Sequence, residues 1–584
     1  MSTEPTATPG DMAFERSISV LEFLQDRHYL FLELRLLLGA AGIIYLGAHA
    51  SLRRPPSASP VTKGDKGKNG KGSEKDVEEE YDEEEEAPMS QGLELSDAIT
   101  FPLMAAAMLI GLYYLIQWLQ DPALLNQALR TYISVMSIVS LSTFFAHTLE
   151  VATSIAFPTW WRGSDGLLRK VSQKARAVVV CDDVGNVIVG RKSDDKVGPL
   201  PGFLGWLTPL AVLRRLAWDA RSVLTRRWLF RLYVHGVGDD KYGVRFTHVV
   251  GIVLSSLTAV VYFWAPSALL SNLLGYSLCY GSLLLLSPTD YLTGSLVLVG
   301  LFFYDIVMVF YTPYMVTVAT KLDVPIKLTF ESAKRKSMLG LGDIVLPGML
   351  MAWALRLDLY MHFLRKVKYE SAELQIVERD ATSGDVTTRT ETKHKEVKAR
   401  YVNVKGRWGD VLWTNGIGAL FFSCGRRRQL PVELAAANFR KTYFYAVLAG
   451  YVFGLMVTLA MLLVFQQGQP ALLYLVPSVL GSLSATALWR GEMGDMWKYT
   501  EDGSLDTRDV VVDLDAEGRV MKTVGKAEDG VVDTSRSDSD KKKKDDKRRD
   551  DKDGGDAKRE KRRETDEGRG LTLVTLDVRE VEKD

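Results

Sequence analysis

The stretch SLVLVGLFFYDIVMVFY, Ser295 to Tyr311, is apolar at almost every position, yet it carries an aspartate, Asp305, at its centre. Its length is close to that of a helix that crosses the hydrocarbon core of a bilayer. A charged aspartate at the midpoint of such a helix costs about 2.5–3.5 kcal/mol on insertion scales. An acid in this place is therefore expected to have a polar partner or a function that requires it.

The rest of the chain repeats this apolar pattern. Of its 584 residues, 47% are hydrophobic, and they gather in long blocks separated by very polar segments. Blocks of about 18–25 residues with few charges have the length that spans a bilayer as a helix. Nine such blocks predict an all-α polytopic membrane protein with nine transmembrane helices. The predicted helices cover about residues 29–52, 101–119, 132–157, 246–266, 268–286, 294–316, 337–357, 443–465 and 470–488.

Two segments outside these helices are rich in charge. The first loop, at residues 53–95, runs from KGDKGKNGKGSEKD into EEEYDEEEE, and the tail, at residues 489–584, contains SDSDKKKKDDKRRDDKDGGDAKREKRRE. Such low-complexity charged sequence is typical of disorder. Near the end of the tail, LTLVTLDV is either a docking strand or a short apolar patch without fixed structure.

Two other loops are long. Residues 158–245 contain ARAVVVCDDVGNVIVGRKSDD, which can form a small hairpin or lie at the membrane surface. Residues 358–442 contain VLWTNGIGALFFSCGRRRQ, an apolar run followed by a basic one, which suits an interfacial helix. The predicted organisation is an N-terminal arm (1–28), helices one to three (29–157), a loop (158–245), helices four to seven (246–357), a loop (358–442), helices eight and nine (443–488) and the tail.

The distribution of positive charge predicts an orientation. Lysine and arginine crowd the first, third and seventh loops and the tail, whereas the N-terminal arm has only Arg16 and Arg27. The positive-inside rule then places the N-terminus in the lumen and the tail in the cytosol. The sixth loop, with Lys327 and the run KRK at 334–336, is an exception because it falls on the lumenal side.

The cysteines and histidines give no sign of a metal site. The cysteines, Cys181, Cys279 and Cys424, are scattered and odd in number, and the seven histidines lack metal-ligand spacing. Neither pattern predicts a disulfide framework. The sequence therefore predicts no metal and no cofactor.

A second acid lies in the next predicted helix. It begins with SMLGLGDIVLPGMLMAW, in which Asp343 is expected about two turns from the start. Neighbouring antiparallel helices can bring Asp305 and Asp343 face to face inside a bundle. Two buried carboxyls that meet tend to share one proton, and this is the state that an aspartic protease uses to add water to a peptide bond.

Other interpretations of these acids remain open. A single intramembrane aspartate often pairs with a lysine or caps a neighbouring helix, although neither predicted helix carries a lysine or arginine at depth. A proton or ion relay in a transporter also uses buried acids, but it needs further polar residues along several helices. A factor that binds or dislocates membrane substrates without cutting them is a third possibility.

Glycine and proline residues supply additional candidates. Gly340 and Gly342 flank Leu341 just before Asp343 and allow either irregular backbone beside the acid or close helix packing. Pro470 stands where the ninth helix begins, so it either starts that helix or holds a loop against the site.

Three short motifs together resemble the signal peptide peptidases, relatives of presenilin. They are YD at Tyr304–Asp305, GxGD at Gly340–Asp343 and PAL at Pro470–Leu472, the last within QPALLYLVP. Further segments agree, namely SDAITFPLMAAAMLIGLY, YMVTVATKLDVPIKLTF and YVFGL, and the resemblance runs from about Ser96 to Tyr499. Each motif is weak alone, but their order and spacing are highly specific.

The resemblance implies a presenilin-like bundle with Asp305 and Asp343 as the catalytic pair. It implies that Tyr304, Gly340, Leu341, Gly342 and the segment Gln469, Pro470, Ala471 and Leu472 shape the site and contact substrate. It also implies cleavage of signal-peptide remnants and type II transmembrane helices in the endoplasmic reticulum membrane, a homo-oligomer, and contact with the degradation machinery of that membrane. Nucleic acid is not an expected partner.

The chain departs from the family pattern in its acidic first loop and its long third and seventh loops. Its last residues, VEKD, also lack the lysine three places from the end that a dilysine retrieval signal requires.

Overall fold

The computed structural model describes residues 27–59, 91–119, 122–188, 198–207, 209–234, 238–322, 327–331, 336–379, 386–421, 430–465, 469–505, 510–514, 520–528, 531–533 and 574–581. The N-terminal arm up to residue 26, the acidic run of the first loop and the lysine-rich run of the tail lie outside these residues.

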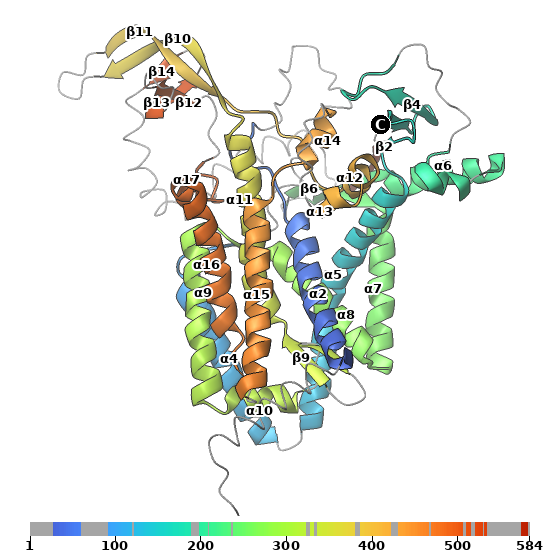
Figure 1. Ribbon diagram of the computed structural model, residues 1–584, viewed down its shortest axis with the longest axis vertical. Coiled ribbons are helices and arrows are strands. Elements are labelled where there is room, and N and C mark those ends of the chain that lie inside the picture. Colours follow the sequence, from blue (N-terminus) through green and yellow to red (C-terminus); the bar gives the residue numbers. More distant parts are fainter. Residues whose placement is uncertain are drawn as a thin grey trace, which may run out of the picture.

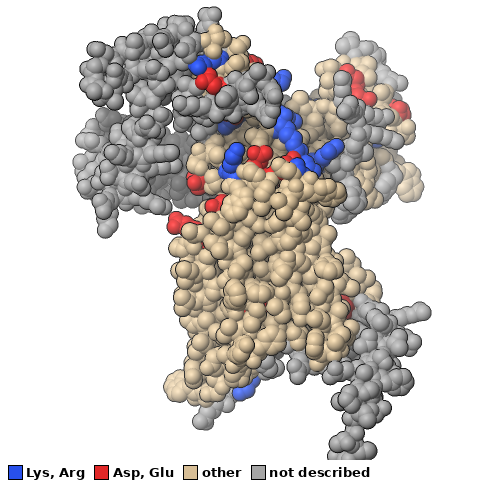
Figure 2. All heavy atoms as spheres, turned by 60° about the vertical axis from the view of Figure 1, so that its left-hand side comes forward, with Lys and Arg blue, Asp and Glu red and all other residues tan. Residues whose placement is uncertain are grey.

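Within the described residues, nine helices are long and apolar enough to cross a membrane, which confirms the predicted number. They run up and down in one bundle (Figure 1). On the face drawn in Figure 2, the middle of the bundle shows few charged side chains. Most of the charged side chains in view lie at one end of it. The helices are α2 (Arg27–Ala50), α4 (Asp97–Leu119), α5 (Pro122–Ala156), α7 (Phe246–Trp264), α8 (Ala268–Leu285), α9 (Tyr291–Ile306), α11 (Gly342–Leu364), α15 (Thr442–Phe465) and α16 (Leu472–Arg490).

Helix α11 is the centre of the bundle. In its spanning window 89% of residues are buried, against 6% for α4 at the periphery. A helix that is apolar on all sides packs on all sides, and α11 contacts α2, α8, α9, α15 and α16. Small residues bring other pairs of helices close together. A Cβ on Gly450 of α15 would lie 2.7 Å from the carbonyl oxygen of Ser478 on α16.

The predicted start of the seventh helix is wrong. Residues from 337 were expected to be helical, but Lys336–Gly340 form strand β9, which pairs antiparallel with β8 (Lys327–Glu331). The glycines interrupt the apolar run, so α11 begins at Gly342 and continues to Leu364. Asp343 consequently lies in the first turn of the helix, and Arg356 lies about two turns before its other end.

The third loop folds at the end of the bundle that carries the charges (Figure 1). Strands β2 (Trp160–Arg162), β3 (Leu168–Ser172) and β4 (Ala177–Cys181) form an antiparallel sheet, which is more than the hairpin considered from sequence. The 3-10 helix η1 (Gly202–Leu207), helix α6 (Ala211–Thr225) and the hairpin β5 (Arg227–Val234) and β6 (Gly238–Arg245) follow.

The seventh loop contains short helices where an interfacial helix was predicted. They are α12 (Trp408–Asn415), α13 (Gly418–Phe421) and α14 (Val432–Ala437), while 422–429 lie outside the described residues. Asp410 of α12 accepts hydrogen bonds from the backbone N–H groups of Thr159 and Trp160, at 2.7 and 3.0 Å. These bonds join the seventh loop to the third.

Much of the described tail is structured, in contrast to the predicted disorder. Helix α17 (Met493–Lys498) follows α16, and β12 (Val510–Leu514), β13 (Val520–Glu528) and β14 (Val531–Asp533) close a barrel with β10 (Lys368–Arg379) and β11 (Val386–Val397). Strand β15 (Val574–Val581) covers most of LTLVTLDV and pairs with β5, which is the docking-strand alternative. In the sequence of β15, Val574, Leu576 and Val578 alternate with polar residues, a pattern typical of a strand.

The remaining described elements connect the helices. Strand β1 (Gln91–Leu93) pairs parallel with β7 (Leu286–Pro288), just before α9. The π-helical turn η2 (Val307–Tyr311) continues α9 and leads to the short helix α10 (Tyr314–Lys321).

Candidate active site

Asp305 lies near the end of α9, directly before the wider turn of η2. The residue is only 3% exposed. Its Oδ2 atom accepts a hydrogen bond from the backbone N–H of Leu472, the first residue of α16, at 3.1 Å. The first N–H groups of a helix have no partner within the helix and carry partial positive charge. The N-terminus of α16 therefore holds the Asp305 carboxylate in place.

Asp343 lies in the first turn of α11 and is half-buried. Its backbone carbonyl accepts a hydrogen bond from the hydroxyl of Tyr451 at 3.3 Å, which ties the start of α11 to α15. Asp305 acts electrostatically on the Asp343 carboxyl. Helices α9 and α11 contact each other and place the two predicted acids within electrostatic range of one another.

The segment before α16 completes this arrangement. Pro470 is buried and precedes Ala471, the N-cap residue of α16. Gln469 accepts a hydrogen bond from the Tyr474 hydroxyl at 3.4 Å, which anchors the segment to the first turn of α16. The chain enters α16 in such a way that the free N–H of Leu472 points at Asp305.

The glycines before Asp343 differ in their surroundings. A Cβ on Gly340 would lie 3.2 Å from Oδ2 of Asp343, whereas a Cβ on Gly342 would meet only Leu346, at 4.0 Å. The missing side chain of Gly340 therefore leaves room for the Asp343 carboxylate, whereas a side chain at Gly342 would not reach that carboxylate. Leu341 and Tyr304 are half-buried against the main core, and no hydrogen bond of the Tyr304 hydroxyl occurs among the described residues.

Within the part of the chain that the structure describes, no group of three or more histidine, cysteine, aspartate or glutamate residues could hold a metal ion.

The sequence model of the family described as signal peptide peptidase matches residues 84–503. The chain belongs to the signal peptide peptidase family. This confirms the resemblance drawn from the three motifs, and the matched range contains all of them and eight of the nine spanning helices.

Curated members of the family show moderate identity. A probable intramembrane protease of Saccharomyces cerevisiae is 25% identical over 429 residues, which cover 69% of this chain and 60% of the relative. The signal peptide peptidase of Mus musculus is 29% identical over 288 residues, 47% of this chain and 56% of the relative. The alignments thus span less than two thirds of either relative. No solved structure matches the chain.

Sequence reasoning missed several polar residues that position the family motifs. Tyr451, which binds the start of α11, was noted only as the first residue of YVFGL in the resemblance. Arg356 and Glu501 were not singled out, although they are 3% and 4% exposed and pair at 2.7 Å. A lone arginine in an apolar helix is itself a signal, because such a residue needs a partner.

Proposed function

We propose that this chain is an intramembrane aspartyl protease in which Asp305 and Asp343 form the catalytic pair. The proposal is supported by the hydrogen bond that the Leu472 N–H donates to Asp305 and by the electrostatic interaction of Asp305 with Asp343. Membership of a family whose relatives are named signal peptide peptidase or intramembrane protease supports the same reaction.

The proposed chemistry needs one charged and one protonated carboxyl. The charged carboxylate removes a proton from water, and the water oxygen bonds to the carbonyl carbon of the scissile peptide while the protonated acid donates to the carbonyl oxygen. As the C–N bond breaks, the leaving amine takes up the proton that came from water, and a hydroxyl of the tetrahedral intermediate returns a proton to the other carboxylate. This leaves a new carboxyl group on the product and restores the pair with one charged and one protonated acid. The Leu472 N–H stabilises a negative charge on Asp305, which favours Asp305 as the charged partner at the start of the cycle.

The neighbouring motif residues are proposed to shape the site. Gly340 gives the Asp343 carboxylate space, and the strand that precedes it offers extended backbone beside the acid. Gln469, Pro470 and Ala471 fix the entry into α16 and hence the N–H that binds Asp305. Leu341, Gly342 and Tyr304 are proposed to contact the substrate, since they surround the two acids along the chain.

The proposed substrates are signal-peptide remnants and other type II transmembrane helices in the endoplasmic reticulum membrane, with the N-terminus in the lumen and the tail in the cytosol. The relative named signal peptide peptidase supports the substrate class. The charges gathered at one end of the bundle (Figure 2) support the orientation. A homo-oligomer and contact with degradation machinery remain expectations from the family resemblance.

The decisive experiment measures cleavage of a signal-peptide-like helix by the purified full chain. Asp305→Asn and Asp343→Asn keep the side-chain size, and each should lower the rate by at least about 10²-fold because each removes one half of the acid–base pair. Asp290→Asn is the matched control on α9. Asp290 caps that helix by accepting from the Thr293 N–H at 2.7 Å, and asparagine caps equally well.

Each result has a clear meaning. A transition-state-analogue inhibitor of aspartic proteases should bind the parent protein and the control, but neither aspartate variant. Normal cleavage by a folded Asp305→Asn or Asp343→Asn variant would refute the pair. Inhibitor binding without cleavage of any tested helix would point to a factor that handles substrates without cutting them.

A further inference from the structure

Helix α6 in the third loop exposes apolar side chains along one side. Val212, Leu216 and Val223 are 66%, 58% and 41% exposed. At 3.6 residues per turn, these three positions lie within about 40° of one another around the helix and form what we call the apolar stripe of α6. Trp218 and Arg221 lie on the opposite side of the helix and are buried. The apolar stripe is therefore not the side by which α6 joins the protein core.

The buried side of α6 packs on the sheet of the third loop. Trp218 lies in one apolar cluster with Trp161, Val171 and Val178, which come from strands β2, β3 and β4. The side-chain amide of Gln173, directly after β3, donates to the carbonyl oxygen of Trp218 at 3.3 Å. These contacts fix the rotation of α6 about its own axis, so the apolar stripe points away from the sheet.

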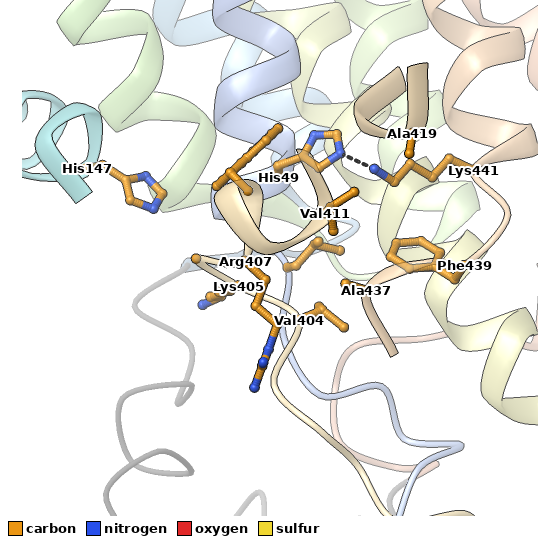
Figure 3. A pocket seen from close by; sticks show the side chains of 13 residues that line it. His49, His147, Val404, Lys405, Arg407, Val411, Ala419, Ala437, Phe439 and Lys441 are labelled. Atoms are coloured by element: carbon orange, nitrogen blue, oxygen red, sulfur yellow. Dashed lines mark hydrogen bonds between the residues drawn. The ribbon is translucent and has the colours of Figure 1, made fainter. Parts of the chain in front are cut away.

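Helix α12 gives the level of α6 along the bundle. A pocket around the loop before α12 is lined by His49 near the end of α2, by His147 of α5 and by Lys441 directly before α15 (Figure 3). The start of α12 therefore lies where spanning helices end. Trp413 of α12 donates through its indole N–H to the carbonyl oxygen of Ile155, the last but one residue of α5, at 2.8 Å. Trp413 also packs against the apolar cluster that holds α6, so α6 lies at the level where α5 leaves the membrane.

The end of α6 lies beside the start of another spanning helix. Helix α6 ends at Thr225, and Arg227 at the start of β5 pairs in register with Arg245, the N-cap residue of α7. Helices α6 and α7 also contact each other. In the second turn of α7, Ile252 and Val253 are exposed, as expected of a surface that faces lipid. Helix α6 therefore adjoins the lipid-facing surface of the bundle at its edge.

The direction of α6 completes its placement. Figure 1 shows α6 lying across the direction of the spanning helices, with strands β2 and β4 farther from those helices than α6 is. Because the apolar stripe is opposite to the sheet, it lies on the side of α6 that is turned towards the membrane. A helix that lies across the bundle at this level is parallel to the plane of the membrane.

The residues around the apolar stripe suit the layer where headgroups meet acyl chains. Arg215 is exposed at the flank of the stripe, where its long side chain can reach lipid phosphates. Trp206 and Leu210, shortly before α6, are exposed as well. Tryptophan is enriched at this layer in membrane proteins because its ring is apolar and its N–H is polar.

We propose that α6 lies in the membrane–water interface, with its apolar stripe among the first carbons of the acyl chains and Arg215 at the level of the phosphates. The partner of this face is thus the lipid surface. Amphipathic helices with an apolar face and flanking arginines bind lipid in this way. The bound helix would hold the sheet of the third loop against the membrane, whether or not the chain cleaves substrates.

The test measures how deeply α6 lies in lipid, with the full chain reconstituted in phosphatidylcholine vesicles. An environment-sensitive fluorophore is attached to Leu216→Cys in a Cys424→Ser background, since Cys181 and Cys279 are buried. Phosphatidylcholines that carry a spin label near the start or near the end of an acyl chain quench a nearby fluorophore, and the ratio of the two effects gives its depth. The fluorophore should lie about 5–10 Å into the boundary between headgroups and acyl chains.

Val432→Cys is the matched control. Val432 is an exposed valine at the start of α14, which packs on the other face of the same sheet through Leu434 in a cluster with Trp160 and Leu168. A fluorophore at Val432 should therefore emit as in water and should not be quenched by either lipid. Ile252→Cys on α7 is the positive control and should be quenched.

Several outcomes would overturn the proposal. Emission as in water from Leu216→Cys, without quenching by either lipid, would place the apolar stripe in solvent, and equal quenching at Val432 would remove the orientation of α6. An unquenched fluorophore in apolar surroundings would show that protein covers the stripe. If dilution to one chain per vesicle then exposes the fluorophore to water, the cover is a second copy, and otherwise it is another segment of this chain. Val212→Cys, four residues earlier on the stripe, should give the same depth as Leu216→Cys and keeps the test decisive if one labelled variant does not reconstitute.

Discussion

Gly340→Ala tests how closely the backbone before α11 is fitted to Asp343. The added Cβ would lie 3.2 Å from Oδ2 and 3.8 Å from Cγ of Asp343, so the carboxylate must move by a few tenths of an ångström. A misplacement of 1 Å in a catalytic group costs about 10²-fold in rate. On a logarithmic scale, a shift of about 0.3–0.5 Å corresponds to a loss of about four- to tenfold.

The assay is the cleavage rate of a signal-peptide-like helix by purified variants at saturating and at low substrate. Gly340→Ala should lower kcat and leave KM nearly unchanged, because the displaced group acts on the reacting bond. Gly111→Ala on the peripheral helix α4 is the control. Its Cβ would meet nothing within 4 Å, and its kcat should match that of the parent.

The effect of Gly340→Ala on the cleavage rate is expected to be local. Gly340 does not have a positive φ, so alanine fits its backbone, and the thermal stability should change little. If a folded Gly340→Ala variant cleaves as fast as Gly111→Ala, the geometry assigned to Gly340 is wrong. If Gly340→Ala loses stability in proportion to activity, the loss reports unfolding and not a displaced carboxylate.

Three further predictions concern stability in detergent, measured by thermal unfolding. Glu501→Gln breaks a buried ion pair and should cost about 3–5 kcal/mol, against less than about 0.5 kcal/mol for Glu94→Gln on the exposed surface; equal effects would contradict the pairing. Burial raises the pKa of Glu492, but hydrogen bonds from three neighbouring side chains outweigh it and hold that pKa at about 2. Because the pKa of Glu492 is lower in the folded protein than in the unfolded one, its charge stabilises the fold above the unfolded value of 4.5. The stability lost in Glu492→Gln should therefore be full above pH 4.5 and shrink as the pH falls towards about 2; a loss independent of pH would refute this. Gly450→Ala places a Cβ 2.7 Å from a carbonyl oxygen of α16 and should cost about 1–3 kcal/mol, while Gly481→Ala meets nothing within 4 Å and should be neutral or stabilising; a neutral Gly450→Ala would contradict the close packing.

The nine helices could be predicted from sequence because a membrane leaves little choice. Backbone groups in hydrocarbon must be paired within the segment, so each long apolar block is helical whatever it packs against. The same logic failed at the start of α11. Strand β9 is apolar enough to extend the block, and its pairing with β8 together with the glycines at its end separates it from the helix.

The candidate site could be predicted in part. The two acids stand out in apolar helices, and antiparallel neighbours can bring them together. The hydrogen bond between Asp305 and the Leu472 N–H joins residues 167 positions apart, and no local sequence pattern predicts it. The segment before α16 could be assigned to the site only because its motif resembles that of a known family.

Arg356 shows why buried charge was the hardest feature to foresee. Its guanidinium pairs with Glu501 at 2.7 Å and donates to the hydroxyl groups of Ser51 and Ser287, at 2.8 and 2.6 Å. Glu501 also pairs with Arg53. The partners come from the end of α2, from β7 and from the tail, so the cost of burying the arginine is offset by residues that sequence alone does not connect.

The cluster around Arg356 and Glu501 connects the two helices that carry the aspartates. The Glu501 backbone N–H donates to the carbonyl oxygen of Thr289 at 2.8 Å, directly before α9, while its side chain holds Arg356 on α11. One residue of the tail therefore fixes the ends of both helices that carry the acids, on the side opposite to the acids themselves. Removing one partner of a buried ion pair leaves an uncompensated charge, to which the surrounding helices must adjust. The loss of this pair should consequently alter the relative placement of α9 and α11, and with it cleavage, even in variants that other substitutions have restored to parental stability.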